Sequence, residues 1–327
     1  MTDLLKIPEG GLHVRVATVT LNPALDLTAG VGRLRPGAVN RVRWEQTDPG
    51  GKGLNVAAFL ADFDVPVAAT GFLGVENDQA FRLLMKEKSI ADAFIAIEGR
   101  TRTNFKIVDE QAGADGITDI NFSGFAVSPT DQAELLDAVE RLATSYDWFV
   151  LGGSLPPGVE MDFYGILVAK LRALGRKVVL DAAGDAARIG IAAGPTLIKP
   201  NLDELSEILG RPVTNAREAA TAAHELHGRG IETVIVSMGA AGAVFSDGYQ
   251  LLLATPPQVE VRSTVGAGDA MVAGYLAARA HGLDLAGAAR LGTAFSLGAL
   301  SVLGPRLPPR AEIERHFGSV HLQTLSQ

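Results

Sequence analysis

The segment STVGAGDA (residues 263–270) stands directly before an Ala- and Leu-rich stretch that is predicted to be a helix. Gly266, Ala267 and Gly268 can present successive backbone N–H groups at the positive end of that helix dipole, which makes an anion-binding nest. Asp269 would then pair a general base with a site for developing negative charge, and phosphoryl transfer requires that pairing. The alternative is an aspartate that only complements the dipole, and we favour the catalytic interpretation.

A second glycine-rich segment, GGKGLN (residues 50–55), precedes another amphipathic stretch. Its glycines would let backbone N–H groups approach a ligand, while Lys52 adds a cation and Asn55 an amide that both donates and accepts. The spacing is neither that of a Walker A loop nor that of the dinucleotide-binding fingerprint. A tight strand-to-helix turn explains these glycines equally well, so this segment alone leaves both interpretations open.

Two further segments end predicted strands. In KPNLDE (residues 199–204), Asn201 and Glu204 fit either a helix-capping pair or groups that hold Mg²⁺ and its water beside a nucleotide. The glycines of SMGAAG (residues 237–242) would admit a nucleotide or form a plain turn.

The rest of the chain alternates short β-branched runs with longer amphipathic stretches, which is typical of βα units around a parallel sheet. Residues 25–46 and 94–122 break this rhythm with short strand-like runs, which predicts a small antiparallel sheet inserted as a lid into a single domain of residues 1–327. One apolar face of such a sheet must be covered, so we expect a homodimer through the lid. The predicted strands are 14–21, 67–71, 149–152, 178–181, 197–199 and 234–237, and the predicted helices are 54–63, 78–86, 131–142, 163–174, 202–209, 217–227, 267–280 and 285–300.

Composition excludes several classes of function. The 327 residues carry 29 Lys and Arg against 37 Asp and Glu, a net charge of −8, which argues against a nucleic-acid partner. The absence of cysteine excludes disulfides, thiolate metal sites and cysteine nucleophiles. The polar N-terminus is unlike a signal peptide and no apolar run approaches ~20 residues, so we expect a cytoplasmic protein with no membrane partner.

Taken together, these segments resemble those of the ribokinase-like carbohydrate kinases, from about Val14 to the terminal helices. GGKGLN and TVGAGD match both signatures of that family. Five more segments are similar to the members that act on fructose 1-phosphate: TVTLNPALD (18–26), GFLG (71–74), GRTRTN (99–104), TDINFSG (118–124) and GSLPPG (153–158). The resemblance implies an open, mostly parallel sheet flanked by helices.

The resemblance also implies a role for each matching residue. Asp269 would take the proton from a sugar hydroxyl, and Gly266, Ala267 and Gly268 would form the anion hole. Sugar hydroxyls would be bound by Asp26, Asn55 and the backbone of Gly50 and Gly51. The phosphate already on the sugar would be bound by Lys52, Arg102 and Asn104, beside Ser154. Lys199, Asn201 and Glu204 would bind the ATP phosphates and Mg²⁺. The nucleotide groove would be lined by Ser237, Gly239 and Gly242.

The implied reaction is phosphorylation of fructose 1-phosphate at carbon 6 by ATP, giving fructose 1,6-bisphosphate and ADP. A fructofuranose ring has near two-fold pseudo-symmetry that exchanges carbons 1 and 6, so kinases of fructose 6-phosphate or tagatose 6-phosphate are alternatives. A sugar-phosphate-binding regulatory protein without turnover is another. The resemblance leaves room for a monovalent cation near the anion hole, and the tail segment GPRLPPR (residues 304–310) matches no motif.

Overall fold

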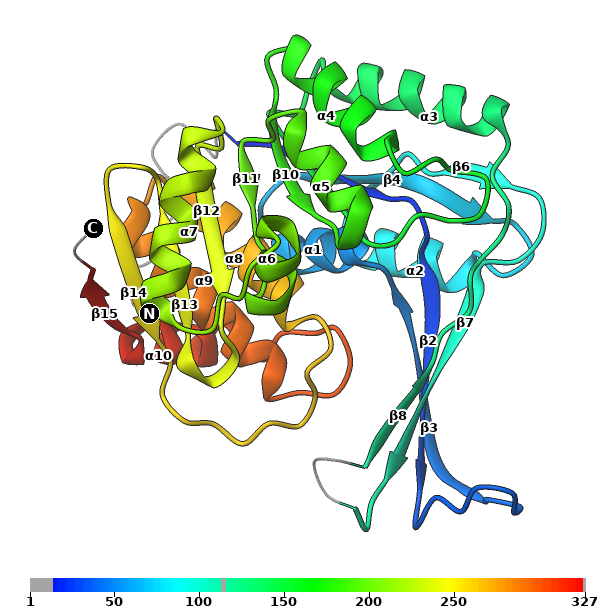
Figure 1. Ribbon diagram of the computed structural model, residues 1–327. Coiled ribbons are helices and arrows are strands. Elements are labelled where there is room, and N and C mark those ends of the chain that lie inside the picture. The colour runs from blue at the N-terminus through cyan, green and yellow to red at the C-terminus, as the bar shows by residue number, and fades with distance from the viewer. Residues whose placement is uncertain (1–13, 113–115, 326–327) are drawn as a thin grey trace.

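The computed structural model describes residues 14–112 and 116–325, which form an α/β body and a smaller sheet that projects from it (Figure 1). The body is built on a sheet with the strand order β15-β14-β13-β12-β11-β10-β9-β1-β4-β5, and β6 also pairs with β4. The strands from β4 to β12 along this order pair in parallel, whereas β12 to β15 pair antiparallel. Their bounds are β1 (Val16–Thr20), β4 (Val67–Gly74), β5 (Ala91–Asp92), β6 (Ile95–Ile97), β9 (Trp148–Gly152), β10 (Lys177–Asp181), β11 (Leu197–Ile198), β12 (Thr233–Ser237), β13 (Ala243–Ser246), β14 (Leu251–Thr255) and β15 (His321–Thr324).

Helices cover both faces of this sheet, which is why its central strands are continuous apolar runs rather than alternating ones. Two apolar clusters fill the space on either side. On one side lie α1 (Lys52–Ala61), α2 (Gln79–Glu87), α8 (Ala267–Ala280), α9 (Leu285–Leu300) and α10 (Arg310–Ser319), and on the other lie α3 (Pro129–Leu142), α4 (Phe163–Ala173), α5 (Gly184–Ala192), α6 (Leu202–Leu209) and α7 (Ala216–Gly228).

Close packing of α8 against α9 depends on a glycine. A Cβ at Gly274 would lie 2.6 Å from the Leu291 carbonyl oxygen, so only glycine permits this approach. Most of α8 is buried, and the helix begins at Gly266 in the left-handed conformation with a φ of 76°. The fold therefore fixes the N-terminal turn of α8 against the body.

The projecting sheet has the strand order β3-β2-β7-β8, with β2 (Ala24–Val31), β3 (Val42–Gly50), β7 (Arg102–Asp109) and β8 (Ile117–Ile120). The inserted sheet expected from the sequence is thus confirmed, with two corrections. Phe94–Ile97 was expected in it, but β6 pairs with β4 in the body. The sheet was also expected to be antiparallel throughout, but β2 and β7 pair in parallel. β2 follows β1 and β7 follows β6, and both β1 and β6 run parallel to β4, so the two strands leave the body in the same direction.

The predicted helices and parallel strands are present, mostly with shifts of one to three residues at their ends. The sequence pattern does not predict α5, α10 or the antiparallel edge from β13 to β15. No helix in the described part of the chain is both long and apolar enough to cross a membrane.

Candidate active site

Five side chains from four parts of the chain meet at the N-terminal turn of α8, and we call them the Asp269 cluster: Asp269, Asn55, Lys52, Asp181 and Lys199. Asn55 Nδ2 donates to Asp269 Oδ2 at 2.8 Å. Lys52 Nζ lies 3.0 Å and Lys199 Nζ 3.6 Å from Asp181 Oδ1. Both carboxylates are buried, with 6% of Asp269 and 4% of Asp181 exposed, and Lys199 is buried as well, whereas the Lys52 side chain is 35% exposed. Two cations thus face two buried anions.

The pKa values of the two buried carboxyl groups are shifted in opposite directions. Burial, reinforced by the negative charge of Asp181, raises the pKa of Asp269 to about 6, although Lys52, Asn55 and Lys199 oppose the shift. Burial also acts upward on Asp181, but Lys199 and Lys52 outweigh it and its pKa is lowered. Burial lowers the pKa of Lys52, but the carboxylates of Asp181, Asp269 and Glu204 raise it by more. The pKa of Lys52 is therefore raised overall. At neutral pH the cluster thus holds one firmly ionised carboxylate and one that is poised to accept a proton.

The turn before α8 has the geometry of an anion nest. Gly266 is the N-cap, and the N–H groups of the first helical turn have no carbonyl partner within the helix. A Cβ at Gly268 would lie 3.1 Å from Lys199 Nζ, so the ammonium group sits against the turn itself. Dipole, N–H groups and ammonium all favour negative charge beside Asp269.

A second group, the Arg102 cluster, consists of Arg102, Asn22 and Ser154. The half-buried guanidinium donates through Nη2 to the Asn22 carbonyl oxygen at 2.9 Å and to Ser154 Oγ at 3.4 Å. Asn22 Nδ2 also donates to Ser154 Oγ at 3.2 Å. The Asn22 Oδ1 atom is buried without a hydrogen-bond partner. The cluster therefore offers a cation, a hydroxyl and a spare acceptor at the junction of the body and the projecting sheet.

Asp26 and Asn104 lie next to the Arg102 cluster on paired strands of the projecting sheet. Asn104 Nδ2 donates to Asp26 Oδ1 at 3.0 Å. Burial raises the pKa of Asp26, although Asn104 and the cations Arg102 and Lys106 oppose the shift. A Cβ at Gly50 would lie 2.4 Å from Asp26 Oδ2, so glycine leaves room for this carboxylate.

The expected nucleotide residues form a well-defined turn. Asn201 and Glu204 cap α6 reciprocally: the Glu204 N–H donates to Asn201 Oδ1 at 2.8 Å, and the Asn201 N–H donates to Glu204 Oε2 at 2.9 Å. The backbone of Ser237 forms an isolated parallel β-bridge with that of Asn201. Gly239 and Gly242 flank the turn that follows β12, both with positive φ. The helix-capping pair that the sequence allows for Asn201 and Glu204 is thus present. Glu204 also lies close enough to Lys52 to raise the pKa of the lysine.

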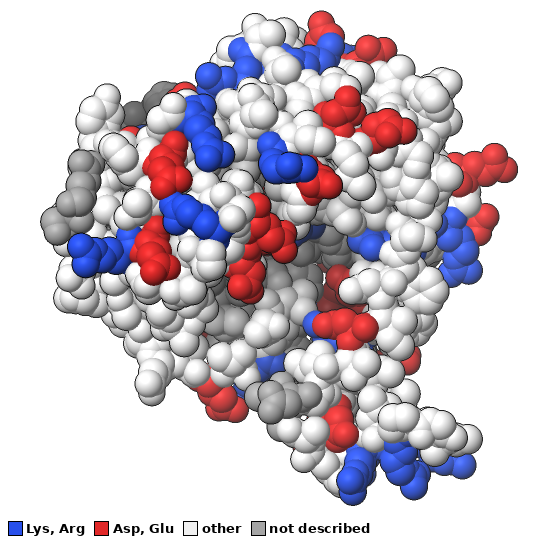
Figure 2. All heavy atoms as spheres, in the orientation of Figure 1, with Lys and Arg blue, Asp and Glu red and all other residues white. Residues whose placement is uncertain are grey.

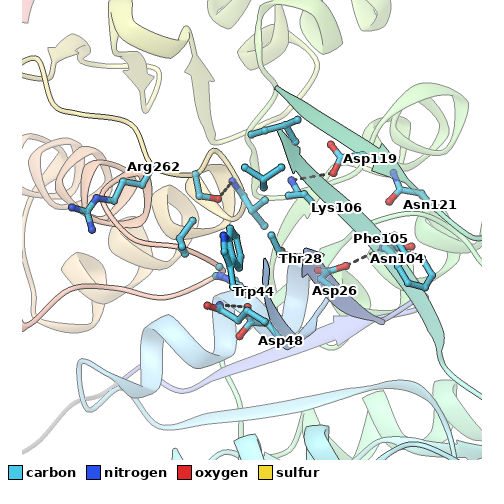
Figure 3. A pocket seen from close by; sticks show the side chains of 18 residues that line it. Asp26, Thr28, Trp44, Asp48, Asn104, Phe105, Lys106, Asp119, Asn121 and Arg262 are labelled. Atoms are coloured by element: carbon cyan, nitrogen blue, oxygen red, sulfur yellow. Dashed lines mark hydrogen bonds and ion pairs between the residues drawn. The ribbon is translucent and has the colours of Figure 1, made fainter. Parts of the chain in front are cut away.

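The space between the body and the projecting sheet is hollowed, with acidic and basic side chains around the hollow (Figure 2). A pocket of about 290 Å³ lies there, lined by Asp26, Asp48, Asn104 and Lys106 from the sheet and by Arg262 and Ser263 from the body (Figure 3). Lys106 Nζ lies 3.1 Å from Asp119 Oδ1 across two strands. Across residues 14–112 and 116–325, no group of three or more His, Asp or Glu side chains is arranged to hold a metal ion.

The structure rearranges some of the expected groupings. Lys52 was expected to share an anion with Arg102, but the ion pair it makes is with Asp181 in the Asp269 cluster. Asn55 was expected to bind the sugar, and its amide bonds Asp269. Asp181 and Asn22 are site residues that have no role among the sequence-based predictions. A charged residue at the carboxyl end of a buried parallel strand was the available signal for Asp181, because ligands bind at that edge of an open α/β sheet.

Comparison with known proteins identifies the family of this chain. The pfkB family carbohydrate kinases match it over residues 20–311. A 1-phosphofructokinase of Rhodobacter capsulatus is 46% identical over 319 residues, covering 96% of this chain and 99% of the relative, and one of Vibrio cholerae is 41% identical, covering 91% and 93%. The crystal structure of phosphofructokinase-2 from Escherichia coli in complex with substrates and products superposes with a TM-score of 0.87 at 28% identity, covering 93% of this chain and 99% of that chain. The chain therefore belongs to the pfkB family of carbohydrate kinases.

Proposed function

We propose that this kinase transfers the γ-phosphoryl group of ATP to carbon 6 of fructose 1-phosphate, giving fructose 1,6-bisphosphate and ADP. The observation that carries the reaction type is the buried Asp269 carboxylate at the anion nest of α8, beside two ammonium groups. The choice of sugar phosphate rests on the relatives named 1-phosphofructokinase, which cover nearly the whole chain.

Asp269 is the general base of the proposed mechanism. With a pKa of about 6 it is mostly ionised at neutral pH, so it accepts the proton of the carbon 6 hydroxyl as the hydroxyl oxygen attacks the γ-phosphorus. The bond from phosphorus to the bridging oxygen breaks, and ADP leaves with that electron pair. Gly266, Ala267 and Gly268 stabilise the transferring group through backbone N–H groups, and Lys52 and Lys199 add positive charge.

The sugar phosphate is held between the two clusters. We assign its phosphate to Arg102 and Ser154, since a guanidinium favours phosphate and would exchange its bonds to the Phe122 and Asn22 carbonyl oxygens for bonds to the ligand. Asp26 and Asn104, with the Gly50 and Gly51 backbone, bind sugar hydroxyls. Lys52, placed beside Asp181, is assigned to the phosphoryl group in transfer, and Asn55 to the orientation of Asp269.

The assignment of Arg102 predicts a selective kinetic defect. Arg102→Ala raises the KM for the sugar phosphate at least tenfold and changes the KM for ATP less than about twofold, because one charge-assisted hydrogen-bond pair is worth about 1.5–3 kcal/mol. Arg100→Ala, an exposed arginine two residues away, is the matched control and leaves both constants unchanged. An equal rise in both constants would contradict the assignment.

The nucleotide occupies the turn at Asn201, Ser237, Gly239 and Gly242 in this proposal. Kinases of this family use ATP, and Mg²⁺ neutralises its phosphates when bound. Glu204 fits such an ion through water, since oxygen ligands suit Mg²⁺ and its negative charge is close enough to Lys52 to act on the pKa of that residue. A structure of the E. coli phosphofructokinase-2 is in complex with potassium. For this chain we propose a monovalent cation, placed beside the anion nest.

The projecting sheet is assigned as a lid and as a homodimer interface. Phe105, Ile120 and Phe122 are 38%, 47% and 51% exposed, and the rings of Phe105 and Phe122 lie 6.0 Å apart. Such an apolar surface is typical of an interaction site, and a second copy of the sheet would cover it. We expect the wild-type protein to sediment as a dimer and the Phe122→Asp variant to sediment as a monomer. A wild-type protein that is fully active as a single chain would overturn the assignment.

The substrate is tested by ADP release with MgATP and each of fructose 1-phosphate, fructose 6-phosphate and tagatose 6-phosphate. We expect the highest kcat/KM with fructose 1-phosphate. Preference for either of the others would keep the mechanism and move the phosphate to the opposite end of the ring. Absence of turnover with all three would favour a sugar-phosphate-binding protein.

A further inference from the structure

The tail segment Gly304–Arg306, which matches no motif, touches two parts of the proposed site at once. On one side, a Cβ at Gly266 would lie 3.4 Å from the Pro305 Cβ, so Pro305 packs against the N-cap of α8. On the other side, a Cβ at Gly304 would lie 2.5 Å from Asp48 Oδ2. The segment thus lies between the anion nest and strand β3 of the projecting sheet.

Arg306, the last residue of this segment, forms an ion pair with Asp48. Its Nη2 donates to Asp48 Oδ1, and Gln46 Nε2 donates to Asp48 Oδ2 at 2.6 Å. The Asp48 side chain is only 5% exposed, whereas that of Arg306 is 58% exposed. Arg306 belongs to the body and Asp48 to the projecting sheet, so the compensating cation reaches Asp48 from outside its own sheet.

Asp48 stands directly opposite Asp26 in the pairing of β2 with β3. Opposed side chains on antiparallel strands have Cβ atoms about 5 Å apart, and like charges in such a pair destabilise it. Asp48 is one of the groups that raise the pKa of Asp26, so the two carboxyl groups do interact. Among the described residues, Arg306 alone forms an ion pair with Asp48, whereas Asp26 forms no ion pair and has Arg102 and Lys106 as nearby cations.

We propose that Arg306 is a positioning residue for the sugar, which acts by neutralising Asp48 and so keeps Asp26 in place at the wall of the pocket. This inference rests on the proposed function, in which Asp26 binds sugar hydroxyls. Without Arg306, a buried anion faces Asp26 with no partner of opposite charge, and the strand relieves the repulsion by admitting water or moving away. The hydrogen bonds and ion pair of the Arg306 and Asp48 side chains do not include the nucleotide turn, so we expect ATP binding to be unaffected.

The experiment compares Arg306→Gln, Arg306→Lys and the double variant Asp48→Asn with Arg306→Gln. Arg310→Gln is the matched control, because Arg310 comes from the same tail but pairs with Asp64. We expect Arg306→Gln to raise the KM for the sugar phosphate about tenfold, with the KM for ATP within about twofold of the wild type. Lysine restores most of the loss because it keeps the charge. The double variant restores it too, because an amide at position 48 leaves no anion to neutralise.

A second readout needs no turnover: amide hydrogen exchange of residues 42–50 in the intact chain. We expect about tenfold faster exchange there in Arg306→Gln, reversal in the double variant and no change in Arg310→Gln. Equal effects of both arginine variants, or a loss that the added Asp48→Asn substitution fails to reverse, overturn the inference. If the wild-type protein turns over none of the sugar phosphates, the proposed function fails, and the exchange data still decide the role of Arg306.

Discussion

Replacing Asn55 by leucine tests whether Asn55 sets the protonation of the base. Asn55 and Asp269 are both 6% exposed and joined by one hydrogen bond of 2.8 Å, which lowers the pKa of Asp269 against the effect of burial. Leucine has the same branched shape, although it is larger, and it suits the interior of α1, but it cannot donate. We therefore expect Asn55→Leu to raise the pKa of Asp269.

The magnitude follows from the strength of that bond. A hydrogen bond to a charged group contributes about 1.5–3 kcal/mol, and each pKa unit corresponds to about 1.4 kcal/mol. The pKa would rise from about 6 to between about 7 and 8. The ionised fraction at pH 7 would then fall from about nine tenths to between about one half and one tenth.

The assay is the pH dependence of kcat with both substrates saturating. A sugar phosphate titrates near pH 6 itself, so kcat/KM would mix its ionisation with that of the enzyme. We expect the acid limb of kcat to lie near pH 6 in the wild type and one to two units higher in Asn55→Leu, with recovery at alkaline pH. Asn104→Leu removes a similar amide–carboxylate bond in the projecting sheet and should leave the limb in place. A uniform loss of kcat in Asn55→Leu, with the limb unmoved, would refute this reasoning.

Two further predictions concern the surroundings of Asp269. Asp181→Asn leaves Lys52 and Lys199 without their carboxylate and should lower the free energy of unfolding, measured in urea, by about 3 kcal/mol at pH 7. Because folding lowers the pKa of Asp181, the difference in unfolding free energy between wild type and variant is fully present above the ordinary pKa of 3.8. It is lost as the pH falls through the folded-state pKa, and a difference that persists in acid would contradict this prediction. Gly268→Ala places a Cβ 3.1 Å from Lys199 Nζ and should lower kcat about tenfold by displacing the ammonium group, whereas Gly228→Ala, with no atom within 4 Å of its Cβ, should leave kcat unchanged. Equal kcat values for the two glycine variants would argue against a role for Lys199 in transfer.

The sequence predicts the parallel core well because each βα unit carries a local signal. Helices 267–280 and 285–300 are present with the predicted bounds, since each is an Ala- and Leu-rich run that starts just after a glycine, Gly266 or Gly282. The edge strands β13 to β15 are short, and β15 pairs with β14 only through a long-range contact that no local pattern contains. Phe94–Ile97 has the alternation of a strand in either sheet, and only tertiary pairing with β4 assigns it to the body.

The candidate site shows the same division. The turn at residues 266–269 is visible in the sequence because its glycines and aspartate are adjacent. The partner of Lys52 is not visible, because Asp181 lies 129 positions away and reaches Lys52 only through the order of strands. Arg306 and Asp48, 258 positions apart, are likewise joined only in three dimensions.

The central claim is that Asp269 is the general base, and Asp269→Asn tests it most directly. The amide keeps the size of the side chain but cannot take a proton at neutral pH. We predict that kcat with MgATP and fructose 1-phosphate falls by about 10²–10⁴. Calorimetric Kd values for both substrates should change less than about threefold. A kcat within tenfold of the wild type would show that another group takes the proton and would contradict the account.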